Sequence, residues 1–194
     1  SENYIRSLGD KKIDPDPKKI QGMTGEEILG IFYRSIEFKK GKYGWHSKLD
    51  ISFYKGKVLN YNILDSNSGK VVLEKGTKVT QRFVDEIQKK KINIFCIEEE
   101  SLIGKFLSCD IINEKNGKIY FEAGYEINEE LIAFLNQNKI TKIYTLKLDN
   151  VDIGSYIRNT LQLDKARSRE EALFEIFKIL RPGEPPTIET AELL

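Results

Sequence analysis

The residue types that most often act as nucleophiles or metal ligands are scarce in this sequence. Its 194 residues include one histidine, His46, and two cysteines, Cys96 and Cys109. The cysteines do not have the spacing of a metal-ligand pair, and a lone histidine without an acidic or sulfur ligand nearby does not form a metal site. A serine-histidine-aspartate set would depend on this one histidine. The sequence therefore predicts neither a metal site nor a catalytic centre in this chain.

A second candidate for chemistry is the basic stretch from Lys39 to Lys48, in which lysines are interleaved with Tyr43 and Trp45. Aromatic faces stack on nucleotide bases, so nucleic-acid binding is one interpretation. The other is a solvated hairpin loop in which Trp45 closes the edge of the core. Because glycines interrupt the stretch, we favour the hairpin.

Two Gly-Lys pairs, at Gly56 and Gly104, lack the other residues of a phosphate-binding loop, and we interpret them as turns that enter strands. The 31 basic and 30 acidic residues leave a net charge of +1. A domain that holds nucleic acid by itself usually carries a basic stripe or a high pI, so this balance argues against that mode. No apolar run approaches the roughly 18 residues of a membrane span. The use of cysteine predicts a reduced, cytoplasmic setting.

The elements that must position any site are dominated by an internal repeat. Gly104, Gly117 and Gly124 lie 48 residues after Gly56, Gly69 and Gly76, with no gap, and the residues around them match. A fixed period of this size indicates one supersecondary unit used twice. Cys96 stands where Tyr144 stands in the other copy, and Cys109 where Tyr61 stands. We therefore interpret both cysteines as core residues.

Each copy has the pattern of a β-hairpin, a helix and a strand. Alternating apolar residues predict strands at Leu59–Ile63 and Leu107–Ile111, followed by turns at Gly69 and Gly117. Gly76 and Gly124 then lead into helices, for which Thr80 and Asn128 are the predicted N-caps. A unit of about 45 residues buries little core alone, so we expect the copies to pack on each other.

Two amphipathic helices bracket the repeat. Thr24 begins a capping box and an apolar stripe that predicts a helix as far as Ser35–Phe38. Ser168 begins a second helix that ends at Leu180, before Pro182 and Gly183. Together these elements predict an α+β fold in which helical segments bracket an inserted pair of hairpin-helix-strand repeats.

The segment Phe177–Thr187, which contains Arg-Pro-Gly-Glu-Pro-Pro-Thr, resembles a characteristic segment of the bacterial RNA polymerase β subunit. Three further stretches resemble motifs of the same family: Thr24–Leu29, Glu74–Thr80 and Tyr156–Leu161. The loop Asp10–Met23 is the one departure from the family's pattern.

The resemblance implies that residues 1–50 and 147–194 form a partial, helical β lobe. Residues 51–98 and 99–146 would then be two copies of a lineage-specific insertion that carries tandem β-β′ module motifs. The resemblance further implies that this chain forms a non-catalytic part of the downstream DNA channel wall. It would belong to an enzyme only as part of the whole polymerase. The implied partners are the β′, α and σ subunits and DNA, with no membrane and no small-molecule substrate. The catalytic Mg²⁺ lies on β′, so no cofactor is expected here, and the expected location is the cytoplasm, in association with the nucleoid.

If any side chain touches DNA, we expect it to be Arg181, at a helix end beside a rigid loop, or Arg158. The alternative for Arg181 is a structural role, in which it caps the helix and pairs with Glu184. The alternative for the whole chain is a stand-alone tandem-repeat interaction module unrelated to transcription. The structural turns and caps predicted from the sequence are Thr24, Gly69, Gly117, Gly76, Gly124, Ser168, Pro182 and Gly183.

Overall fold

The structure is a computed structural model that describes residues 22–48, 50–90, 92, 94–113, 116–148, 153–166 and 168–193. It divides into two compact units, one formed by Gly25–Leu163 and the other by the remaining residues. The loop predicted over Asp10–Met23 lies outside the described residues except for its last two positions.

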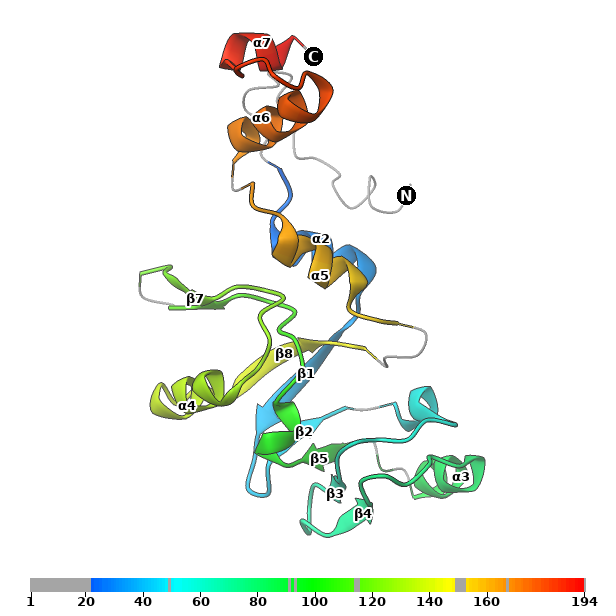
Figure 1. Cartoon of the computed structure of the whole chain (residues 1–194). Coiled ribbons are helices and arrows are strands. Elements are labelled where there is room, and N and C mark those ends of the chain that lie inside the picture. The colour runs from blue at the N-terminus through cyan, green and yellow to red at the C-terminus, as the bar shows by residue number, and fades with distance from the viewer. Residues whose placement is uncertain are drawn as a thin grey trace, which may run out of the picture. The chain divides into compact units, whose positions relative to one another are not determined.

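Among the described residues, six strands form the main sheet of the larger unit, in the order β4-β3-β5-β2-β1-β8 (Figure 1). A separate two-stranded sheet pairs β6 with β7. The strands are β1 Ser35–Lys40, β2 Trp45–Ser47, β3 Ile63–Asp65, β4 Val71–Leu73, β5 Phe95–Ile97, β6 Ile111–Ile112, β7 Ile119–Phe121 and β8 Lys142–Leu146. With the helices described below, these strands confirm the predicted α+β class.

The helices of the two copies begin and end at matched positions. The α-helices α3 Gln81–Lys89 and α4 Glu129–Gln137 are offset by 48 residues, as are the 3-10 helices η2 Ile51–Tyr54 and η3 Glu99–Leu102. Thr80 accepts a hydrogen bond from the Phe83 backbone N–H at 3.2 Å, and Asn128 accepts one from Leu131 at 2.9 Å. Each cap satisfies a backbone donor that the first helical turn leaves without a partner.

The first strand of each copy begins later than predicted. Leu59 and Leu107 lie outside strands, which start only at Ile63 and Ile111. Their carbonyls instead accept the backbone N–H groups of Gly76 and Gly124, at 2.8 and 2.7 Å. The apolar alternation is real, because both leucines are buried, but their backbone hydrogen bonds go to the segment that precedes the helix.

The prediction that the first helix continues to Ser35–Phe38 is wrong. Helix α2 spans Gly25–Phe32, and β1 begins at Ser35. Strand β1 pairs along its length with β8, from Ser35 opposite Leu146 to Lys39 opposite Lys142. The apolar residues Ile36 and Phe38 fit a strand period as well as a helical one, and the distant partner strand decides between them.

The β1–β2 hairpin lies between the final strands of the two copies. β2 pairs with β5 of the first copy, and β1 pairs with β8 of the second. Trp45 is fully buried in a core cluster that joins Phe38 of the hairpin to Ile143 of the second copy. The copies therefore share one sheet through a hairpin that precedes both, in agreement with the hairpin interpretation of Lys39–Lys48.

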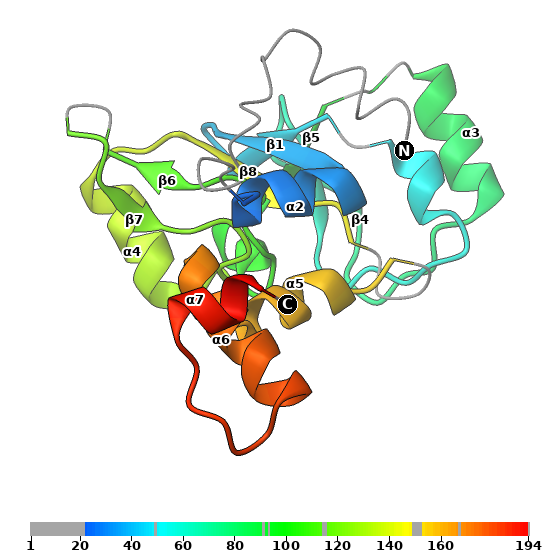
Figure 2. The same cartoon turned by 90° about the horizontal axis from the view of Figure 1, so that it is seen from above.

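Helix α2 lies beside α5, Tyr156–Leu163, in both views of the larger unit (Figures 1 and 2). The Tyr33 hydroxyl joins the end of one helix to the start of the other. It donates to the Gly154 carbonyl at 3.0 Å and accepts from the Ile157 N–H at 3.1 Å. We refer to these two helices as the α2–α5 pair.

The smaller unit contains α6 Arg169–Leu180 and α7 Ile188–Glu192. Ser168 is the N-cap of α6 and accepts from the Glu171 N–H at 3.2 Å. Thr187 forms a capping box with Thr190 at the start of α7. Gly183 has a φ of 93°, which lets the chain reverse after Pro182.

Candidate functional site

Arg181 combines the predicted structural role with an exposed side chain. It is the C-cap residue of α6, and its backbone N–H donates to the Phe177 carbonyl at 2.8 Å. Its guanidinium lies 3.5 Å from the Glu184 carboxylate, and the two side chains are 55% and 60% exposed. An exposed ion pair of this kind contributes at most about 1 kcal/mol to the free energy of unfolding. A DNA phosphate could therefore replace the Glu184 carboxylate as the partner of Arg181 without a large loss of stability.

Arg158 contacts the second copy directly. Its Nε donates to the Gly124 carbonyl at 2.7 Å, and its guanidinium carbon lies 4.3 Å from the centre of the Phe106 ring. A guanidinium over an aromatic face gains cation–π attraction beside the hydrogen bond. Arg158 thus packs α5 against the turn at Gly124, and its contact with DNA stays a prediction.

The second copy packs against the α2–α5 pair, a contact that the sequence analysis did not predict. Ala123 and Leu146 are buried with Leu29 and Tyr33 in one core cluster. The backbone N–H of Asp110 donates to the Glu26 carboxylate at 3.0 Å. We refer to this set of contacts as the docking face of the second copy.

The repeat itself carried a signal for the docking face. Ala123 corresponds to Lys75 in the first copy, and Phe106 corresponds to Val58. Val58 is 60% exposed and Lys75 is exposed, whereas Ala123 is buried. At both positions the residue of the second copy is less exposed than its counterpart in the first copy. Such differences in residue type indicate where the two copies have different neighbours.

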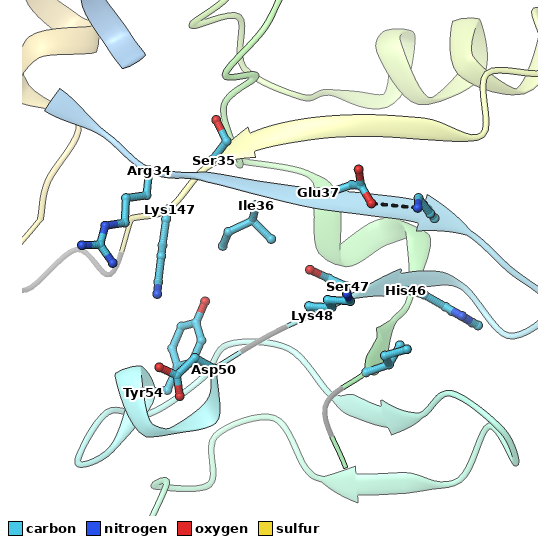
Figure 3. A pocket seen from close by; sticks show the side chains of 12 residues that line it. Arg34, Ser35, Ile36, Glu37, His46, Ser47, Lys48, Asp50, Tyr54 and Lys147 are labelled. Carbon is cyan, nitrogen blue, oxygen red and sulfur yellow. Dashed lines mark ion pairs between the residues drawn. The ribbon is translucent and has the colours of Figure 1, made fainter. Parts of the chain in front are cut away.

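A cleft of about 500 Å³ opens where β1 and β2 separate beyond the Lys39–His46 pair. Figure 3 shows its lining side chains, which include the cations Arg34, Lys48 and Lys147 and the carboxylates Glu37 and Asp50. Hydrogen bonds from Lys142 and Lys39, each with an N–O distance of 2.9 Å, lower the pKa of Glu37 to about 2. Lys147 lies 3.9 Å from the Phe53 ring centre. The cleft therefore brings together cations and carboxylates, and its Lys39 and Glu37 are paired with each other.

The two thiols lie in surroundings that oppose nucleophilic chemistry. Burial, and then the nearby Glu98 charge, raise the pKa of the buried Cys96. Burial is also the main cause that raises the pKa of Cys109. A protonated thiol is a poor nucleophile and a poor metal ligand, which agrees with a packing role. Within the described part of the chain, no group of three or more His, Cys, Asp or Glu residues is placed to hold a metal ion.

A second cavity, of about 560 Å³, lies between the copies. Lys105 of the second copy places its ammonium 4.4 Å from the ring centre of Tyr61 of the first copy. Burial raises the pKa of the Tyr61 hydroxyl and lowers the pKa of Lys105 to about 8. That shift corresponds to about 3 kcal/mol in favour of the neutral amine. The ring favours the ammonium by about 0.5–2 kcal/mol, so burial outweighs it.

Comparison with known proteins places the chain among segments of a long protein. It is 48% identical over 173 residues to a protein of Bartonella tribocorum, and 46% identical over 173 residues to proteins of Brucella canis and Brucella suis. These matches cover 89% of the chain but only 12–13% of each relative. No family model matches the chain. In the described residues, no helix combines the length and apolar character needed to cross a bilayer.

All three relatives are named DNA-directed RNA polymerase subunit beta. The chain is therefore homologous to a segment of the RNA polymerase β subunit, about an eighth of its length, as the sequence motifs predicted.

Proposed function

We propose that the chain is a non-catalytic part of the β lobe of DNA-directed RNA polymerase and forms part of the downstream DNA channel wall. The observation that carries the proposal is the 46–48% identity over 89% of the chain to polymerase β subunits. In this proposal the chain acts within an enzyme whose catalytic Mg²⁺ lies on β′, in the cytoplasm and in association with the nucleoid. Its partners are the β′, α and σ subunits and DNA.

The backbone geometry supports a lobe that carries an inserted module. The Lys147 N–H donates to the Arg34 carbonyl at 2.7 Å, so the chain leaves α2 and returns toward α5 at neighbouring points. Between these two residues lie the β1–β2 hairpin and both copies. We therefore place the start of the module at Ser35 rather than at residue 51, because β1 and β2 lie in the same sheet as the copies. The module would offer its outer surface to other proteins.

Whether the protein assembles with the other polymerase subunits distinguishes this proposal from the alternative, a stand-alone interaction module. An affinity-tagged full-length chain, expressed in its own cells, should co-purify with β′, α and σ in fixed stoichiometry and with nucleotidyl transfer activity. Recovery of the full-length chain without β′ and without that activity would contradict the proposal.

The DNA contact of Arg181 has a matched control on the same helix. Lys178 pairs with Glu175 at 3.1 Å, and both side chains are exposed, as in the Arg181–Glu184 pair. In the intact polymerase, Arg181→Ala should shorten the lifetime of the open promoter complex and reduce its salt dependence by about one phosphate contact. Lys178→Ala should change neither. Unchanged lifetimes for Arg181→Ala would exclude the contact and leave Arg181 its capping role alone.

A further inference from the structure

Strand β1 is paired along one edge and largely unpaired along the other. β8 pairs with five consecutive residues of β1, from Ser35 to Lys39, whereas β2 pairs only with Lys39 and Lys40. Among the described residues, positions 35–38 therefore have no partner strand on the side that faces the cleft between β1 and β2. An unpaired edge of this kind offers backbone donors and acceptors to an added strand.

The pairing with β8 shows which backbone groups of β1 face the cleft. The Lys147 N–H donates to the Arg34 carbonyl at 2.7 Å, and the register with β8 continues from this pair without a break. Successive residues of an antiparallel strand direct their N–H and carbonyl groups to opposite sides. The backbone groups of Ser35 and Glu37 consequently point away from β8 and toward the cleft, where no group of the described residues bonds to them.

The opposite wall of the cleft has a matching free edge. The Lys39–His46 pair is the last one between β1 and β2, although β2 continues to Ser47 in its pairing with β5. By the same alternation, the backbone of Lys48 faces β1 at the place where a pair with Glu37 would form. The two edges instead diverge around the cavity of about 500 Å³ (Figure 3). A cavity of this volume is within the range of ligand pockets.

The charges around the cleft indicate the chemistry of what could enter it. Four cations and two carboxylates line it among the described residues, namely Arg34, Lys39, Lys48, Lys147, Glu37 and Asp50. Glu37 is already paired with Lys39 and with Lys142. Arg34 and Lys48, in contrast, form no ion pair with a carboxylate of the described residues. An acidic segment would therefore meet positive charge that the chain itself leaves uncompensated.

The cleft also presents apolar side chains. Ile36 of β1 and Tyr54 of η2 line it, and both point into the space between the two walls in Figure 3. Ile94, just before β5, is a third apolar lining residue. Because the side chains of a strand alternate between two faces, a strand with alternate apolar and acidic residues could satisfy both the apolar lining and the cations.

We propose that an extended segment of a partner protein, with acidic and apolar residues in alternation, enters this cleft as a strand and pairs with β1. Its backbone bonds to the free N–H and carbonyl groups of Ser35 and Glu37, which is the mode of recognition called β-strand addition. Since β1 and β2 are antiparallel, the segment can be antiparallel to only one of them, and β1 offers the longer edge. The proposal does not depend on the role of the chain in transcription.

Amide hydrogen exchange with single-residue resolution tests the pairing in the full-length protein. The probe is an acetylated and amidated peptide of alternating glutamate and valine. At saturation it should slow exchange at the Ser35 and Glu37 amides by at least about tenfold. The amides of Ile36 and Phe38, which face β8, should not change. The same peptide methylated at every backbone nitrogen keeps its side chains but has no N–H donors, so it should protect neither amide.

Variants of the two walls separate strand addition from binding by charge alone. Ser35→Pro removes an N–H that faces the cleft at the first residue of β1, where proline is tolerated, and should abolish protection of Glu37. Ser35→Ala keeps that N–H and should bind as the parent does. The double variant Arg34→Gln and Lys48→Gln should weaken peptide binding by about fivefold. Lys118→Gln, at an exposed lysine of the second copy, should leave it unchanged.

Three results would overturn the proposal. The first is unchanged exchange at Ser35 and Glu37 with the glutamate–valine peptide at millimolar concentration. The second is equal protection by the methylated peptide, which would mean that charge and apolar contact suffice. The third is protection of the two amides that rises with protein concentration in the absence of peptide, because a second copy of the chain would then cover the edge of β1.

Discussion

The two copies of the repeat share a backbone and differ in what they touch. The φ angles of Gly56 and Gly104 are both 82°, and those of Gly76 and Gly124 are 82° and 85°. A Cβ added at Gly76 would meet open space, whereas at Gly124 it would lie 3.3 Å from Leu29 and 3.5 Å from Arg158. The turns and caps thus specify the unit, and a few side chains on its surface specify which copy docks on the α2–α5 pair.

The last strand of each copy also shows that the two copies share a unit but differ in their contacts. In the first copy β5 pairs with β3, so the hairpin and the final strand are continuous in one sheet. In the second copy Thr145 of β8 pairs with Leu107 instead, and the β6–β7 hairpin forms a separate sheet. The pairing at Leu107 lies next to Phe106, whose ring packs on Arg158. The second copy therefore departs from the first beside its docking face.

The largest expected effect comes from exchanging the residues that differ most between the copies. Ala123→Lys places a charge where the side chain is 8% exposed and packed with Leu29, and should lower the free energy of unfolding by about 2–4 kcal/mol. Lys75→Ala, the reverse exchange at the exposed position, should change it by less than about 0.5 kcal/mol. Urea denaturation of the two variants measures the difference. Equal losses would mean that both positions are equivalent.

A smaller contrast is expected at the matched glycines. Gly76→Ala should lower the free energy of unfolding by about 1 kcal/mol, because a residue with a Cβ is strained at positive φ. Gly124→Ala carries the same strain and also pushes on Leu29, so its loss should be about 2 kcal/mol. The thermal midpoints of both variants give the comparison. A larger loss at Gly76 than at Gly124 would contradict the assignment of the docking face.

The helix caps should show no contrast at all. Thr80→Ala and Asn128→Ala each remove one side-chain acceptor from a helix of the same length and position. Each should lower the free energy of unfolding by about 1 kcal/mol, and the two values should agree within a few tenths. Circular dichroism in urea measures both. A difference above about 1 kcal/mol would show that the shared backbone does not make the copies energetically equivalent.

The smallest effect concerns the pH dependence of the contact between β1 and β8. Glu37 bonds to Lys142, which stands where the first copy has Ile94. Because the folded pKa of Glu37 is lowered to about 2, its contribution is present above the ordinary carboxyl pKa of about 4.3 and is lost as the pH falls toward 2. Glu37→Gln should therefore be less stable than the parent at pH 6, and this difference should shrink steadily as the pH falls from about 4 to 2. A difference in stability that stays constant from pH 6 to pH 2 would assign the effect to side-chain packing.

The local signals in the sequence predicted the elements that depend on local physics. Thr80, Asn128 and Ser168 are caps because their oxygen atoms reach a backbone N–H within the next turn, which spacing alone reveals. The prediction that the first helix reaches Phe38 was wrong because β1 forms by pairing with β8, which lies more than 100 residues later in the chain. Arg158 was proposed for DNA, but its observed hydrogen bond to Gly124 is a long-range contact that composition cannot indicate.

Hydrogen exchange of the α2–α5 pair tests most directly whether the second copy anchors the module. If it does, Ala123→Lys should accelerate amide exchange in Gly25–Phe32 and Tyr156–Leu163 by at least about tenfold, while Lys75→Ala leaves both helices unchanged. Unchanged protection of both helices in Ala123→Lys, measured in a folded variant, would show that the α2–α5 pair is held without the second copy.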